Sequence, residues 1–117
     1  MKINNKNING PGAYSAVWLF ALFDLPVVTK IDRKEYTKFR KFLISKGFTM
    51  LQFSVYAIYF SSEEASISLQ NMIQERIPPS GQVRLLLVTD KQFGKRKVFF
   101  GKNEGNIEKP LPQILLF

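Results

Sequence analysis

The chain contains no cysteine and no histidine among its 117 residues. Without cysteine it forms no disulfide, offers no thiol nucleophile and has no thiolate ligand for zinc. Without histidine it lacks imidazole metal ligands and the side chain that most often performs acid–base catalysis near neutral pH. An enzyme built on this sequence would depend on carboxylates, hydroxyls, amines and a hard metal ion.

Long hydrophobic runs are also absent. A membrane span needs about 18 or more consecutive apolar residues, whereas the run over residues 17–23 ends at Asp24 and the terminal QILLF is shorter still. Residues 1–15 are rich in Asn and Gly and lack the apolar centre of a signal peptide. We therefore predict a disordered leader, no membrane segment and a cytoplasmic location.

Positive charge is in clear excess. The chain has 17 Lys and Arg against 9 Asp and Glu, a net charge of +8 and a pI near 9.9. Such a balance favours a polyanionic partner, with nucleic acid first and an acidic membrane surface as the competing interpretation. The length and the 45% hydrophobic content suit one small compact domain.

Periodicity along the chain predicts alternating strands and helices. Residues 17–23 are apolar throughout, as in a central strand covered on both faces or placed in an interface. A helix is expected from Asp32, with a capping box to Glu35, up to Lys46-Gly47. Residues 47–60 read as two strands joined near 52–54.

A second helix is expected after a capping box formed by Ser61 and Glu64, and it ends at Pro78. Its predicted apolar face comprises Ala65, Leu69, Met72, Ile73 and Ile77. Further strands are expected at QVRLLLVTD, KVFFG and QILLF. This order predicts an α+β, ferredoxin-like β-α-β-β-α-β sandwich with extra C-terminal strands. Its domain would cover residues 16–102, followed by a tail over 103–117 for dimer or partner binding.

Two of the nine acids are candidates for a functional site. The others fall in helix first turns or polar segments, where capping or solvation explains them. Asp90 ends a strand and is best interpreted as a turn residue. Asp24 is either a turn acid before Leu-Pro or a metal ligand. One carboxylate binds Mg²⁺ weakly, so a metal site here would need a twofold dimer that brings two copies together.

The motifs together carry a family resemblance. FALFDLPV, then DRKEYTKFRKFLISKGFTMLQFSVYAIYF, and then VRLLLVTDKQFGKRKVFFG closely resemble the CRISPR-associated protein 2 family, especially members that accompany type II systems. This resemblance implies a ferredoxin-like homodimer in which the terminal strand of each subunit joins the partner's sheet. It also implies a metal-dependent endonuclease acting on RNA or DNA, and an adaptor that bridges dimers of the CRISPR-associated integrase.

On this resemblance Asp24 is the catalytic metal ligand, and two copies across the dimer's dyad would share one Mg²⁺ or Mn²⁺. Arg33 and Arg40, seven residues apart on one helical stripe, suit phosphate contacts, with a solvated basic face as the alternative. The other candidate nucleic-acid contacts are Lys34, Lys38, Lys41, Lys95, Arg96 and Lys97, and the candidate site-lining residues are Phe53 and Ser54.

The leading functional hypothesis is a nucleic-acid-binding dimeric adaptor for spacer acquisition with a metal-dependent nuclease activity. The alternative is a metal-independent module of the RNA recognition motif type, which shares the same element order and stacks bases on sheet aromatics. Tyr56 and Tyr59 would supply those rings. The glycine-containing aromatic signature expected on the third strand of such a module is missing from SVYAIYF.

Overall fold

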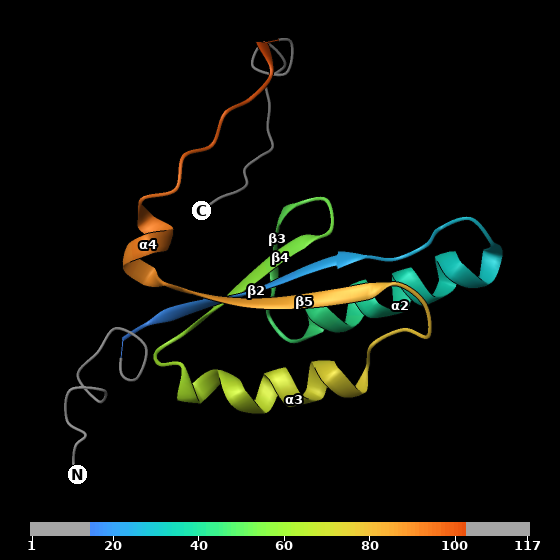
Figure 1. Ribbon diagram of the computed structural model, residues 1–117, viewed down its shortest axis with the longest axis horizontal. Helices are drawn as coiled ribbons and strands as arrows, with labels where there is room; N and C mark the ends of the chain where they lie inside the picture. The colour runs from blue at the N-terminus through green and yellow to red at the C-terminus, as the bar shows by residue number, and fades with distance from the viewer. Residues whose placement is uncertain (1–14, 103–117) are drawn as a thin grey trace.

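The computed structural model describes residues 15–102, so the predicted leader up to residue 14 and the tail over 103–117 lie outside the described part. Figure 1 shows the order of the elements. They are β2 (Val17–Asp24), α2 (Lys30–Ser45), β3 (Thr49–Gln52), β4 (Val55–Phe60), the 3₁₀ turn η1 (Glu64–Ser66), α3 (Ile67–Glu75), β5 (Gln82–Thr89) and α4 (Asp90–Gly94).

The four strands form one antiparallel sheet in the order β3-β4-β2-β5. This is the order of a ferredoxin-like sandwich, and the predicted fold class is confirmed. The fully apolar strand β2 is central, between β4 and β5. Its residue Val17 faces Thr89, and Asp24 faces Gln82. Asp24 and Asp90 therefore lie at opposite ends of the sheet, as the sequence predicted.

Alternation along β2 divides the sheet into two faces. Val17, Leu19, Ala21 and Phe23 are buried, whereas Asp24 and the intervening Trp18, Phe20 and Leu22 are not. The buried set packs with side chains of α2 and α3, so both helices cover the same face. The core below them includes Leu43, Tyr56 and Ile73, each at most 1% exposed. Within the described part of the chain, the other side of the sheet has no long helix on it, although Phe93 of α4 packs there against Trp18 and Phe20. We call this side the open face.

The start of α2 differs from the predicted start. The helix begins at Lys30 with Thr29 as its N-cap, and Asp32 is the third residue of the capping box instead of its first. The Thr29 hydroxyl accepts a hydrogen bond from the Asp32 amide at 3.0 Å, and the Asp32 carboxylate accepts one from the Thr29 amide at 3.1 Å. The predicted end is confirmed, because Gly47 follows with a φ of 103°, which favours glycine.

The predicted capping box of Ser61 and Glu64 is wrong by one residue. The hydroxyl of Ser62 caps this turn and accepts from the Ala65 amide at 3.1 Å. A 3₁₀ turn then precedes α3 proper. On the predicted apolar face Leu69 and Ile73 are buried, but Ala65 is exposed, Met72 is 38% exposed and Ile77 is 42% exposed. The face that packs on the sheet is thus narrower than the apolar pattern suggested.

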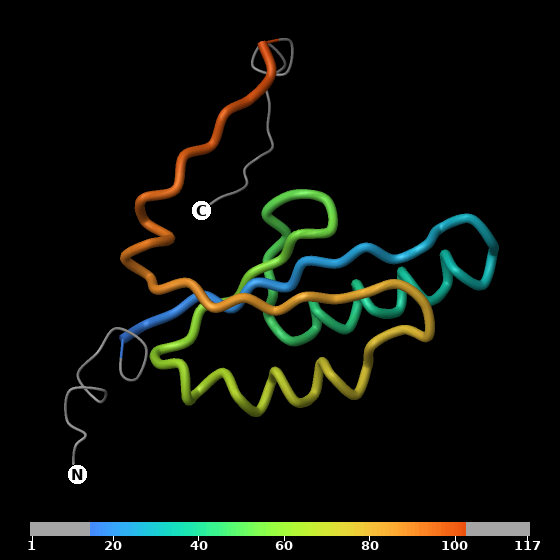
Figure 2. The backbone as a smooth tube through the Cα atoms, in the orientation of Figure 1, coloured from blue at the N-terminus to red at the C-terminus, as the bar shows by residue number. Residues whose placement is uncertain are grey.

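The predicted strand over residues 97–101 does not form within the single chain. The short helix α4 follows β5, and the chain then runs away from the sheet over residues 95–102 (Figure 2). Val98, Phe99 and Phe100 are 57%, 84% and 70% exposed. A strand needs a neighbour to accept its hydrogen bonds, and this segment does not lie along a described strand. We call residues 97–101 the arm.

Within residues 15–102, no helix is both long and apolar enough to cross a membrane.

Candidate functional site

Asp24 is the last residue of β2 and is exposed at the edge of the open face. The next residue, Leu25, is only 8% exposed and anchors the chain as it leaves the sheet. Within the described residues, the Asp24 carboxylate makes no hydrogen bond or ion pair. A capping or turn role would occupy its oxygens with backbone amides. The carboxylate is instead available to an external cation or proton donor.

Two neighbouring turns hold the backbone of Asp24 in place. Gly81 adopts a φ of 91°, and a Cβ atom at this position would lie 2.5 Å from the Asp24 carbonyl oxygen and 2.8 Å from Leu25 Cδ2. Only glycine permits this close approach. On the other side, the Phe23 amide donates to the Ser54 carbonyl at 3.1 Å, which ties the β3–β4 turn to the same strand end. The backbone that carries the candidate ligand is thus in contact with both turns.

The β3–β4 turn carries both predicted site-lining residues, Phe53 and Ser54. Ser54 has a φ of 64°, which is uncommon for a residue other than glycine. The hydroxyls of Ser54 and Tyr36 lie 3.4 Å apart, and the Phe53 ring stacks on the Tyr36 ring with centroids 6.0 Å apart. Phe53 is 76% exposed. The structure therefore brings these residues to the end of β2, while their role in a site stays a prediction.

The two arginines of the predicted phosphate stripe have different surroundings. Arg33 is exposed, but its Nη1 donates to the carbonyls of Val27 and Val28 at 3.3 and 2.9 Å, so it also closes the loop before α2. Arg40 is partly buried and lies near the Tyr56 phenol. Exposed lysines complete the basic side of α2, namely Lys34, Lys38 and Lys41.

The second predicted basic group lies at the opposite end of the sheet from Asp24. The Asp90 amide donates to the Ala16 carbonyl at 2.9 Å, and the Trp18 indole donates to the Asp90 carboxylate at 2.9 Å. Asp90 therefore anchors α4 and behaves as the structural residue that the sequence predicted. The exposed residues after α4 are Lys95, Arg96 and Lys97, and the Arg96 guanidinium lies 3.9 Å from the Phe93 ring centroid.

Arg84 is a candidate that sequence reasoning missed. It faces Leu22 across the β2–β5 ladder, two residues from the Asp24–Gln82 pair, and it is exposed. The available signal was a single arginine inside the apolar run QVRLLLV, at a position that alternation places on one face with Gln82 and Leu86.

A hard-metal site at Asp24 would be weak in one chain. No group of three or more His, Cys, Asp or Glu side chains gathers among residues 15–102. Mg²⁺ accepts one or two protein carboxylates and completes its shell with water and phosphate oxygens. The exposed Asp24 carboxylate has the right donor chemistry, and one chain supplies one such ligand. A second copy of Asp24 would supply another and strengthen the site.

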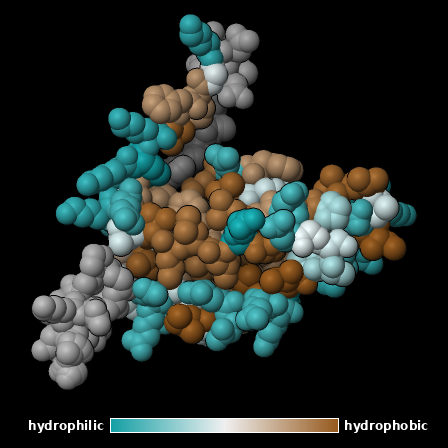
Figure 3. All heavy atoms as spheres, in the orientation of Figure 1, coloured by the Kyte–Doolittle hydropathy of each residue, from teal (hydrophilic) through white to brown (hydrophobic). Residues whose placement is uncertain are grey.

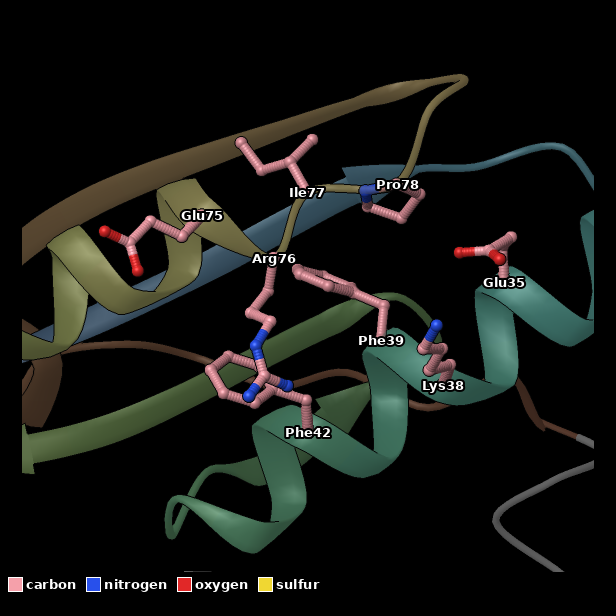
Figure 4. A pocket seen from close by; sticks show the side chains of 8 residues that line it. All are labelled: Glu35, Lys38, Phe39, Phe42, Glu75, Arg76, Ile77 and Pro78. Atoms are coloured by element: carbon pink, nitrogen blue, oxygen red, sulfur yellow. The ribbon is translucent and has the colours of Figure 1, made fainter.

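A hollow on the helix side of the sheet is lined by both charged and apolar residues. It measures about 200 Å³ and is bordered by residues of α2, the end of α3 and the following turn. Figure 4 shows the Arg76 side chain extending over the Phe42 ring, and its guanidinium carbon lies 4.8 Å from the ring centroid. Lys38 and Glu35 project from α2 at the rim. Because its lining comes from α2, the end of α3 and the turn that follows, and carries charges of both signs, we interpret this hollow as a packing seam between two helices.

Tyr56 and Tyr59 point to opposite faces of β4. Tyr56 is fully buried on the helix side, and its hydroxyl has no hydrogen-bond partner within the described part of the chain. Burial raises the pKa of the Tyr56 phenol, and the positive charge of Arg40 opposes that rise. Tyr59 is 51% exposed and packs edge-on to Trp18, with centroids 5.6 Å apart. Only one of the two rings is therefore placed to stack on a base.

Comparison with known proteins gives concordant matches. The family model described as CRISPR associated protein Cas2 matches residues 17–96. A CRISPR-associated endoribonuclease Cas2 of Flavobacterium psychrophilum is 38% identical over 104 residues, which cover 89% of this chain and 90% of that protein. A protein of the same name from Parvibaculum lavamentivorans is 42% identical over 102 residues, which cover 86% of this chain and 100% of that protein.

A solved structure described as a crystal structure of cas2 has the same fold. Its TM-score is 0.53 at 17% identity, and the match covers 86% of this chain and 100% of that chain.

Proposed function

This chain belongs to the CRISPR associated protein Cas2 family, and from that premise we propose that it is a nucleic-acid-binding nuclease and adaptor of CRISPR spacer acquisition. The observation that carries the nuclease part is the Asp24 carboxylate, exposed, unpaired among the described residues and fixed at the end of the central strand. RNA is the first substrate to test because both relatives are named endoribonucleases. DNA remains the second.

Asp24 would be the protein ligand for Mg²⁺ or Mn²⁺. When bound, such an ion supplies positive charge that polarises a phosphodiester and lowers the pKa of water. The chain's own contribution is positional, because Gly81 and the Ser54 carbonyl fix the backbone that presents the carboxylate. Preorganised ligands of this kind lose little freedom when a substrate arrives.

A homodimer is part of the proposal. The open face of β2 and β5 is apolar, with Trp18, Phe20 and Leu22 partly exposed and Leu86 53% exposed. Figure 3 shows hydrophobic side chains gathered over the middle of this view of the molecule. A second copy is the occupant that we propose for this face, because pairing would also bring two Asp24 carboxylates into one site. The arm, with its exposed Phe99 and Phe100, would then extend onto the partner.

Nucleic-acid binding in this proposal is mainly electrostatic. The exposed lysines of α2 and the basic residues after α4 offer charge without an obvious element for reading bases. The same surface would hold DNA while an integrase performs its chemistry. A pull-down from a host that expresses the neighbouring genes should recover an integrase together with DNA. Recovery of neither would count against the adaptor role.

The nuclease proposal is tested with a matched pair of variants. Asp24→Asn keeps the shape of the side chain but removes its negative charge, whereas Asp90→Asn makes the same change at the other end of the sheet. Asp90 accepts a hydrogen bond from Trp18, and an asparagine oxygen can still accept it. We expect Asp24→Asn to fold, dimerise and bind RNA but to lose Mg²⁺- or Mn²⁺-dependent cleavage. Asp90→Asn should cleave like the wild type.

Equal cleavage by wild type and Asp24→Asn would show that Asp24 takes no part in cleavage. Cleavage without added metal would indicate a contaminating nuclease. If spacer acquisition persists in cells that carry Asp24→Asn, then the adaptor role does not need the nuclease site.

The RNA recognition motif alternative is weakened by the burial of Tyr56. Such modules stack several bases on aromatic side chains of the sheet face, and here Tyr56 is enclosed in the core while only Tyr59 is exposed on β4. A stable monomer that binds single-stranded RNA without metal would nevertheless favour the alternative.

A further inference from the structure

Arg84 and Asp24 share one end of the open face. In β5, Gln82 faces Asp24 and Arg84 faces Leu22, so Arg84 is the diagonal neighbour of Asp24 on the same side of the sheet. Diagonal neighbours in an antiparallel pair lie about 7–8 Å apart. Both residues are exposed. A cation and a carboxylate are thus presented side by side, each carried by a regular strand.

The two groups do not neutralise each other. Within residues 15–102, no carboxylate lies close enough to Arg84 to form an ion pair. A guanidinium offers five N–H donors in a planar fork that matches the oxygens of a phosphate. An arginine side chain is long enough to span the distance between diagonal neighbours, yet among the described residues Arg84 makes no contact with the Asp24 carboxylate. The geometry therefore leaves the donors of Arg84 available to a phosphate.

In the proposed dimer, the surroundings of Arg84 would favour an anion. Its neighbours on the open face are apolar, with Leu22 opposite and Leu86 two residues along β5. If a second copy covers this face, Arg84 becomes partly desolvated at the edge of the interface. A charge removed from water is costly unless a counter-charge accompanies it. A phosphodiester brought to Asp24 for cleavage would supply that counter-charge.

We propose that Arg84 binds a phosphate of the nucleic-acid substrate next to Asp24 and so sets which phosphodiester is presented to that carboxylate. This inference rests on the proposed function, since it deepens the site centred on Asp24. It assigns to β5 a substrate contact separate from the basic side of α2. The chemistry it recognises is the backbone phosphate, so the contact is independent of base sequence.

Binding of single-stranded RNA in EDTA tests the assignment without catalysis. Arg84→Gln removes the charge, Arg84→Lys retains it without the fork, and Lys46→Gln is the matched control. Lys46 follows the far end of α2, about 24 Å of helix from the Asp24 end at 1.5 Å per residue. We expect Arg84→Gln to weaken binding about tenfold. Its salt slope should fall by about 0.7 for one lost single-strand phosphate contact. Arg84→Lys should keep the slope, and Lys46→Gln should match the wild type in both.

Sedimentation and thermal unfolding of the same variants identify the cause. Arg84→Gln that binds with wild-type affinity and slope would overturn the inference while leaving cleavage at Asp24 intact. Loss of the dimer together with affinity would also overturn it, because Arg84 would then be an interface residue. A wild-type protein that binds no nucleic acid would overturn both the inference and the proposed function.

Discussion

Replacing Gly81 by alanine tests how closely the chain packs behind the candidate ligand. The new Cβ would lie 2.5 Å from the Asp24 carbonyl oxygen and 3.0 Å from Leu25 Cα, both backbone atoms that cannot rotate away. The φ of 91° is itself unfavourable for alanine. Both effects act in the folded state, so Gly81→Ala should destabilise the protein.

The magnitude follows from three contributions. Positive φ in a residue with a side chain costs roughly 1–2 kcal/mol, and overpacking costs typically about 1–3 kcal/mol. Alanine also restricts the unfolded chain, which returns about 0.4–1 kcal/mol. The unfolding free energy should therefore fall by roughly 1–5 kcal/mol. Because Asp24 would shift with its backbone, cleavage should fall as well.

Gly94→Ala is the matched control for urea denaturation. Gly94 ends α4, has no positive φ, and an added Cβ would meet no atom within 4 Å. Its unfolding free energy should stay the same or rise by about 0.4–1 kcal/mol. Both variants are compared with wild type at one protein concentration, since dimerisation would make stability concentration-dependent. A Gly81→Ala protein within about 0.5 kcal/mol of wild type would refute the packing argument.

Three further predictions address other parts of the chain. The raised pKa of buried Tyr56 means that its contribution to stability is complete below pH 10.0 and is lost as pH rises through the folded pKa. Tyr56→Phe should remove this alkaline loss in urea midpoints compared at pH 9 and 11, and an unchanged slope would contradict it. Thr29→Ala should cost about 1 kcal/mol of unfolding free energy, while Thr29→Ser keeps the cap; equal losses would exclude capping by the hydroxyl. Phe99→Ser with Phe100→Ser should weaken the dimer in sedimentation without changing the helical circular dichroism, and an unaffected dimer would show that the arm is dispensable.

Local sequence patterns predicted most of the helices and strands, because the propensities of neighbouring residues largely determine where such elements form. Alternation, β-branched content and turn residues placed the β3–β4 hairpin and β5 close to their observed bounds. Helix starts were less accurate, since several nearby hydroxyls and carboxylates satisfy the same capping pattern. In the structure Thr29 and Ser62 are the residues whose hydroxyls cap these turns. Which hydroxyl caps depends on the path of the chain into each helix, and hydrophobic periodicity does not report that path.

The candidate site, too, was predicted only in part from the sequence. Asp24 is conspicuous in the sequence because it ends an apolar strand. The structure shows its carboxylate exposed and without a partner among residues 15–102, while its role as a metal ligand stays a prediction. Helical spacing places Arg33 and Arg40 on one stripe. In the structure, however, Arg33 donates hydrogen bonds to the backbone of the loop before α2, whereas Arg40 lies beside Tyr56. Spacing shows which residues share a stripe but not what lies opposite that stripe.

The ferredoxin-like order, the absence of thiol and imidazole chemistry, the basic charge and the isolated acid at residue 24 could all be read from the amino-acid sequence. Three other features emerge only when the chain is folded: Gly81 packs against Asp24, Arg84 shares the Asp24 end of the open face, and Tyr56 is enclosed while Tyr59 is exposed. Propensity and periodicity act over a few residues, whereas Gly81 and Arg84 lie 57 and 60 positions from Asp24 in the chain and approach it through strand register. Tyr56 is buried because it packs in the core with residues of α2 and α3, which are also distant in sequence.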